Sequence, residues 1–161
     1  MKTEVYANKD WQHVGKVPEA GNIYADGMWC FNVGDRTART CDADGKSGRG
    51  NYYPLKIDEG DQSYPYSGKN ARVGQLIFRV GEKGMPEAFD MRRGSFEGGE
   101  DLWMRINDSG LDDNDGCLTL RFASAADSRD YDAQFAATNS YGDPIGTQYD
   151  RDGAGNYVKR G

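Results

Sequence analysis

The sequence predicts an all-β protein, a jelly-roll or β-sandwich of short antiparallel strands followed by a polar C-terminal tail. Glycine is frequent, with 22 residues among 161, and short alternating segments recur between turns rich in Gly, Asp and Asn. Closely spaced strands with glycine turns are typical of sandwiches and jelly rolls. No stretch gives an amphipathic helix of about ten or more residues.

The expected strands succeed one another at short intervals. Val73–Val80 is the most regular, and Asp26-Gly27 is a dipeptide favoured in hairpin turns. Val33–Gly50 is polar and glycine-rich, so we expect a long loop there. The expected strands are Glu4–Ala7, Trp11–Val17, Asn22–Ala25, Met28–Phe31, Val73–Val80, Ala88–Asp90, Ser95–Phe96, Leu102–Ile106 and Cys117–Phe122.

The character of the chain changes after Ala123. Residues 124–161 are rich in Asp, Ala, Gly, Ser and Tyr and contain few aliphatic residues. We therefore predict one β-sandwich domain at residues 1–123 and a polar tail or linker with some local order at 124–161. A short helix around Ser128–Ala137 is the one helical element we consider.

Charge and length exclude several classes of function. The net charge of −6 argues against binding to nucleic acid or to anionic membranes, both of which need a basic face. No apolar stretch approaches the roughly 20 residues that cross a membrane, so we expect no membrane insertion. Met1–Val5 has no hydrophobic signal region, which leaves the cytoplasm, non-classical export or a place in a larger secreted protein open.

The three cysteines have no CxxC spacing and no supporting histidines, so zinc is not favoured. We expect reduced thiols, and a disulfide between Cys30 and Cys41 stays open. Trp29 and Trp103 fall within expected strands, and we expect both in the core. His13, the one histidine, is expected on a strand surface rather than at a ligand site.

The stretch Asn107–Gly116 gathers four carboxylates, two carboxamides and a serine hydroxyl in ten residues between two expected strands. Calcium is a hard cation that takes about 6–8 oxygen ligands, so this composition predicts a calcium-binding loop. The alternative is a solvated acidic turn. An EF-hand is excluded, because Leu111 and Phe122 would stand at its first and twelfth ligand positions.

The order of motifs resembles that of the PA-I type galactophilic lectins, bacterial calcium-dependent lectins with a jelly-roll sandwich. The resemblance covers roughly residues 4–122. The family's His-Pro-x-Gln pattern is replaced by Tyr64-Pro65-Tyr66-Ser67. The motifs that carry the resemblance are Gly27-Met28-Trp29, Gly60-Asp61 with Tyr64-Pro65, Gly74–Gly81, Leu102–Asp108 and Asp113-Asn114-Asp115-Gly116.

The resemblance implies that a loop-bound calcium ion ligates two vicinal hydroxyls of a galactose-type sugar. The implied metal ligands are the side chains of Asp108, Asp113 and Asn114 and backbone carbonyls near Leu111 and Asn32. The implied sugar contacts are Tyr64, Ser67, Asp108 and Asp113. Asp112 and Asp115 are expected to be solvated neighbours.

No nucleophile elbow, Cys–His pair or phosphate-binding loop is present in the sequence, so we expect a binding protein rather than an enzyme. Carbohydrate is the expected partner, and a homo-oligomer is compatible with the sequence. Two alternatives stay open. One is a calcium-stabilised structural module of a larger adhesin, toxin or phage assembly. The other is an accessory carbohydrate-binding module of a polysaccharide-degrading enzyme.

Overall fold

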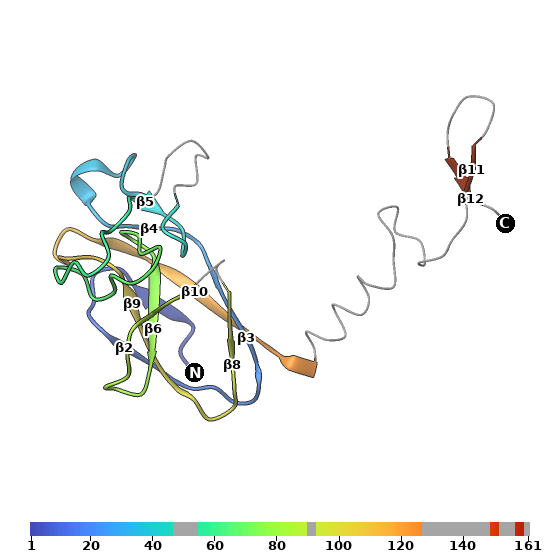
Figure 1. Ribbon diagram of the computed structural model, residues 1–161, viewed down its shortest axis with the longest axis horizontal. Helices are drawn as coiled ribbons and strands as arrows, with labels where there is room; N and C mark the ends of the chain where they lie inside the picture. Colours follow the sequence, from blue (N-terminus) through green and yellow to red (C-terminus); the bar gives the residue numbers. More distant parts are fainter. Residues whose placement is uncertain (47–54, 90–92, 127–148, 152–156, 160–161) are drawn as a thin grey trace. The chain divides into compact units, whose positions relative to one another are not determined.

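The computed structural model describes residues 1–46, 55–89, 93–126, 149–151 and 157–159. The chain divides into two compact units, Met1–Ser124 and Ala125–Gly161. In the first unit, two antiparallel sheets enclose one hydrophobic core (Figure 1), which confirms the predicted all-β sandwich.

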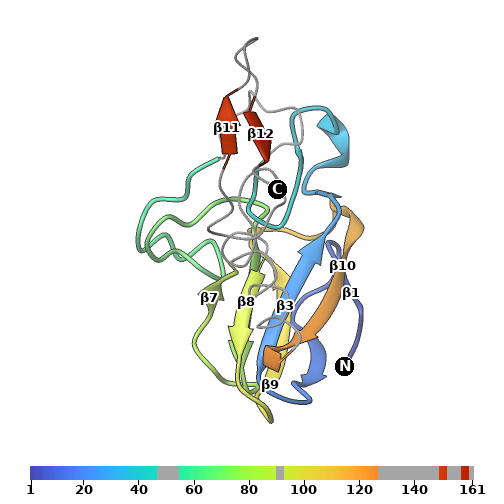
Figure 2. The ribbon, with the colours of Figure 1, turned by 90° about the vertical axis from the view of Figure 1, so that its right-hand side faces the viewer.

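The larger sheet has the strand order β5-β4-β10-β3-β8, and β1 also pairs with β10. In Figure 2, β8, β3, β10 and β1 run side by side. β10 is the longest strand and pairs with three others, so it organises this sheet. The bounds are β1 Glu4–Tyr6, β3 Gly21–Asp26, β4 Trp29–Cys30, β5 Thr40–Cys41, β8 Arg93–Phe96 and β10 Asp115–Ser124.

The smaller sheet has the order β2-β9-β6-β7. Its central strand, β9, alternates in burial because successive side chains of a strand point to opposite faces. Leu102, Met104 and Ile106 have no exposed surface and belong to the core, whereas Trp103 between them is half-buried on the other face. The predicted core position of Trp103 is therefore wrong. The bounds are β2 Gln12–Lys16, β6 Leu76–Val80, β7 Glu87–Ala88 and β9 Asp101–Ile106.

Trp29 lies in the core, as predicted, with 1% of its surface exposed. Its indole Nε1 donates to the backbone oxygen of Gly74 at 2.7 Å, so the buried polar group is satisfied. Gly74 has a φ of +87°, and a Cβ there would lie 2.5 Å from the Sγ of Cys41. This contact between the two sheets therefore requires glycine at position 74.

The predicted loop Val33–Gly50 contains two short elements. A 3₁₀ helix, η1, spans Val33–Asp35, and the Asn32 side chain caps it by accepting a hydrogen bond from Gly34 N at 2.9 Å. β5 then pairs with β4. The three cysteines are free, and the pairing of these strands places Cys41 opposite Trp29 rather than opposite Cys30.

In the second unit, β11 (Tyr149–Arg151) and β12 (Tyr157–Lys159) form an antiparallel pair. Of the predicted tail, the structure also describes residues 124–126, and Ser124 is the last residue of β10. The short helix considered around Ser128–Ala137 lies outside the described residues. Within the described ranges, no helix has the length and apolar character needed to span a membrane.

Candidate metal centre

The loop between β9 and β10 lies at one end of the sandwich, where three connections meet. Figure 1 shows it in yellow to orange beside the green loop that precedes β6 and the cyan segment that follows β4. Hydrogen bonds join these connections. Asn107 bonds to the backbone of Tyr66, and Val33 N donates to Asp113 O at 2.7 Å. The fold thus brings together the acidic loop, the Tyr64–Ser67 loop and the Asn32 segment.

Asp108 and Asn114 are buried side chains of the acidic loop, and each has one oxygen atom that accepts no hydrogen bond from a described residue. Asp108 is 8% exposed and Asn114 is 6% exposed. The Asn114 Nδ2 donates to Ala7 O at 2.9 Å, which ties the loop to the end of β1. Asp108 Oδ2 and Asn114 Oδ1 are both fully covered, and no described group donates to either.

Buried oxygens without a donor cost about 1–3 kcal/mol each, so natural structures usually pair them with a protein group, a water or an ion. Two such oxygens in one loop form an electron-rich pair of hard donors. This chemistry suits a hard cation such as calcium, which binds carboxylate, amide and carbonyl oxygens. The residues present therefore fit the metal that the sequence resemblance implies.

The electrostatics of Asp108 agree with a role that needs a cation. Burial raises the pKa of this carboxyl, and the nearby charge of Asp113 raises the pKa further. The Asn114 side chain and the backbone N–H groups of Ser109 and Gly110 act in the opposite direction. Burial is the largest of these effects, so ionised Asp108 is less favoured in the folded protein than in the unfolded chain.

Arg105 holds the start of the acidic loop in place. Its Nη2 donates to Asp108 O at 3.1 Å, its Nε donates to Ile106 O at 2.9 Å, and its Nη1 pairs with Asp10 Oδ1 at 2.6 Å. Burial lowers the pKa of Arg105, and the nearby Asp10 carboxylate offsets part of this effect. The guanidinium thus bonds the backbone carbonyl of Asp108 rather than its carboxylate. No local sequence pattern indicates this role of Arg105.

The other predicted metal ligands lie on the same loop or beside it. Asp113 is exposed, and its charge is close enough to act on Asp108. The carbonyl of Leu111 accepts from Asn114 N at 3.1 Å, and the carbonyl of Asn32 accepts from Asp35 N at 3.1 Å. Each carbonyl keeps a second lone pair for a further contact.

The second predicted loop is fastened to the first by Asn107, which is completely buried. Its Oδ1 accepts from Tyr66 N at 3.1 Å, and its Nδ2 donates to Tyr66 O at 2.9 Å. Tyr64 is half-buried and packs against the core, and Ser67 O accepts from Gly60 N at 2.9 Å to close the loop. The residue next to Asp108 therefore fixes where the Tyr64–Ser67 loop lies.

Asp112 and Asp115 are exposed. The Asp115 carboxylate pairs with Arg36 Nη1 at 3.0 Å, and the hydrogen bond from Arg36 lowers the pKa of Asp115. Asp115 thus has its own counter-charge, in contrast to Asp108.

Among the described residues, no group of three or more His, Cys, Asp or Glu side chains is arranged to hold a metal ion. The candidate site at Asp108 and Asn114 has a different composition, with one buried carboxylate, one amide and nearby backbone carbonyls. Searches against family models, curated proteins and solved structures find no match to this chain. The chemistry of the centre therefore has to be inferred from its own residues.

Proposed function

We propose that this protein is a calcium-dependent carbohydrate-binding protein, a lectin that recognises galactose-type sugars. The observation that carries the proposal is the pair of buried oxygens without donors, Asp108 Oδ2 and Asn114 Oδ1. The ion would be held by these two side chains, by Asp113 and by the carbonyls near Leu111 and Asn32. Calcium bound there supplies a Lewis-acidic centre whose open positions take hydroxyl oxygens.

The sugar half of the proposal is supported by how the loops meet. Two hydrogen bonds between Asn107 and Tyr66 keep the Tyr64–Ser67 loop next to Asp108. A sugar with two neighbouring hydroxyls on the ion would have this loop beside it. Asp108 and Asp113 would accept hydrogen bonds from those hydroxyls, and bonds to carboxylates are stronger than neutral ones.

A second candidate function is a structural β-sandwich in which calcium only stiffens the loop. The observation that favours it is the packing of Tyr64 against the core, which uses part of the ring that a sugar would contact. In that case calcium would raise the melting temperature, but no glycan would bind.

Binding to a glycan array, measured in calcium and in chelator, separates the two functions. The lectin proposal predicts signals on galactose-terminated glycans that disappear in chelator. Tyr64→Ala should weaken these signals while the calcium-induced rise in melting temperature persists. A calcium-dependent rise in melting temperature with no glycan signal would reject the lectin and favour the structural module.

A further inference from the structure

A row of aromatic and basic side chains crosses the outer face of the smaller sheet. The strand pairing puts His13 on β2 opposite Trp103 on β9, and Trp103 opposite Arg79 on β6. The His13 and Trp103 rings stack at 4.5 Å between centroids. The Arg79 guanidinium carbon lies 5.8 Å from the Trp103 ring centre and 4.4 Å from that of Trp11. We call Trp11, His13, Arg79 and Trp103 the aromatic–arginine row.

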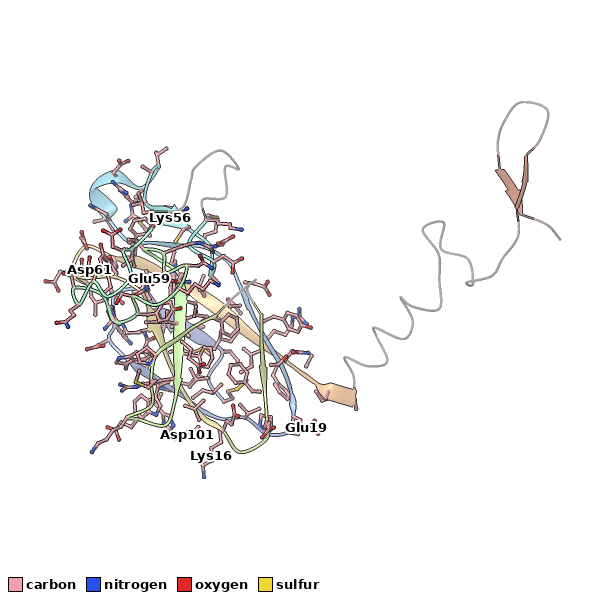
Figure 3. The ribbon with its side chains drawn as sticks, viewed as in Figure 1. Lys16, Glu19, Lys56, Glu59, Asp61 and Asp101 are labelled. Carbon is pink, nitrogen blue, oxygen red and sulfur yellow. The ribbon has the colours of Figure 1, made fainter. Side chains whose placement is uncertain are left out.

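The row faces away from the core, and its two ends lie differently with respect to the candidate metal centre. At the Trp11 end, Arg105, which bonds Asp108 O, has its guanidinium carbon 6.0 Å from the Trp11 ring centre. Figure 3 places Asp101, whose carboxylate bonds to His13 at 2.6 Å, at the opposite end of the sandwich from Glu59 and Asp61. Glu59 and Asp61 belong to the connection that meets the acidic loop. Trp11, Arg79 and Trp103 are half-buried and His13 is exposed, so part of each side chain reaches solvent.

The aromatic–arginine row contains a positive charge without a carboxylate partner and two N–H donors without acceptors among the described residues. The basic neighbours Arg105 and His13 each contact a carboxylate, from Asp10 and Asp101 respectively. Arg79 has no ion pair with any described residue, although the chain carries a net charge of −6. Arg79 Nε and Trp103 Nε1 are also covered donors without an acceptor in the described part of the chain.

These features define the ligand that the row suits. A guanidinium binds a carboxylate through two parallel hydrogen bonds, and its unpaired charge selects an anion. Arg79 lies over the Trp11 ring and His13 stacks on Trp103, and the part of each indole that remains exposed offers an apolar surface that suits the C–H face of a sugar ring. The protein's negative charge disfavours a dense polyanion such as nucleic acid.

We propose that the aromatic–arginine row is a second carbohydrate-binding surface, which takes saccharides bearing a carboxylate. Arg79 binds the carboxylate, and the sugar ring lies against Trp11 and Trp103. This surface shares only its class of ligand with the proposed lectin function. It needs no calcium, so it can be tested with the metal centre emptied.

Tryptophan fluorescence of the full chain in chelator gives a direct readout. The chain has three tryptophans, and Trp29 is buried in the core, so a change on ligand addition reports on Trp11 and Trp103. Titration with a galacturonic acid trimer should give a saturable change. The methyl ester of the same trimer, which lacks the charge, should bind at least about tenfold more weakly, because a bond to a charged group is lost. No saturable change, or equal affinities for acid and ester, would overturn the proposal.

Arg79→Gln should weaken binding of the trimer at least about tenfold. Arg121→Gln is the matched control, because Arg121 lies 4.5 Å from the ring of Tyr24 on the other sheet. It should bind as the wild type does. Equal affinities in Arg79→Gln and wild type, or equal losses in both variants, would contradict the assignment. If Arg79→Gln does not fold, Arg79→Lys replaces it, with weaker binding expected because lysine lacks the planar fork.

Two further outcomes keep the proposals separate. A change in tryptophan fluorescence that follows protein concentration alone, with a dimer in sedimentation that Arg79→Gln abolishes, would make the row an interface between copies and overturn the inference. Acid-trimer binding in chelator without any calcium response in melting supports the row and rejects the metal centre.

Discussion

Two acidic turns of this protein are similar in composition and differ in how their carboxylates are satisfied. In the turn Asp42–Lys46, Asp42 Oδ1 accepts from the backbone nitrogens of Asp44 at 2.9 Å and Lys46 at 3.1 Å. In the acidic loop, Asp108 Oδ2 is buried and receives no bond from the described residues. Both turns therefore donate backbone hydrogen bonds to their aspartate, but only the Asp108 loop buries a carboxylate oxygen, Oδ2, that has no donor among the described residues.

The difference arises from what lies around each turn. The backbone of the Asp42 turn folds over its carboxylate, as an Asx turn does. Around Asp108, the Asn114 side chain and the backbone N–H groups of Ser109 and Gly110 hydrogen-bond the carboxyl group, but no described group donates to the buried Oδ2. An acidic sequence by itself therefore does not identify a cation site. Burial together with unpaired oxygens is the stronger indication.

The largest effect should come from Asn107, which anchors the acidic loop and has no counterpart in the Asp42 turn. Asn107→Ala removes both bonds to Tyr66 and leaves buried backbone groups unpaired, so the free energy of unfolding should fall by about 3 kcal/mol. Urea denaturation measures this loss. The exposed Asn8→Ala is the control, with a change within about 0.5 kcal/mol. A loss below about 1 kcal/mol for Asn107→Ala would mean that the loops hold together without it.

An effect of intermediate size is expected when Asp42 and Asp108 are substituted and the free energies of unfolding are compared. In chelator, Asp42→Ala should lower the free energy of unfolding by about 1 kcal/mol, because two backbone donors lose their acceptor. Asp108→Asn should change it by less than about 0.5 kcal/mol or stabilise the protein, because it removes a buried charge. Chemical denaturation of both variants in chelator is the measurement. Equal destabilisation by the two substitutions would remove the distinction between the turns.

The smallest effect is a pH dependence of the chelator-treated protein. Because burial raises the folded-state pKa of Asp108, the folded protein holds this proton more tightly than the unfolded chain. The cost of the buried charge is present above the folded pKa and is relieved as pH falls toward the ordinary value of 3.8. Asp108→Asn should lose this contribution, seen as a difference between the two pH–stability curves. Parallel curves in chelator would show that Asp108 ionises without cost.

Most of the strands could be predicted from the sequence, because alternation and glycine turns report on local structure. β6 covers Leu76–Val80 of the predicted strand Val73–Val80, and Cys117–Phe122 lies within β10. The predicted core position of Trp103 is wrong because an aromatic residue within a strand can lie on either face. The alternation of Leu102, Met104 and Ile106 already indicates that Trp103 faces outward.

Less of the candidate site than of the fold could be predicted from the sequence. The composition of Asn107–Gly116 indicates a cation-binding loop, and the family resemblance implies Asp108, Asp113 and Asn114 as ligands. The structure buries Asp108 and Asn114 and leaves Asp113 exposed. The roles of Arg105 and Asn107 depend on partners about 95 and 41 residues away in sequence, Asp10 and Tyr66, so no local pattern could give them. The elements η1 and β5 fall within the predicted loop Val33–Gly50. β5 is only two residues long and is defined by its pairing with β4, and η1 is a single turn capped by Asn32, so neither gives a periodic pattern.

The central claim is that Asp108 and Asn114 hold a calcium ion, and thermal unfolding of the full chain in calcium and in chelator tests it most directly. At a calcium concentration about 100 times its Kd, binding contributes about 2.7 kcal/mol, which raises Tm by about 10 °C for a domain of this size. Asp42→Asn should keep this rise, and Asp108→Asn should abolish it. A wild-type Tm that is the same in calcium and in chelator would contradict the account.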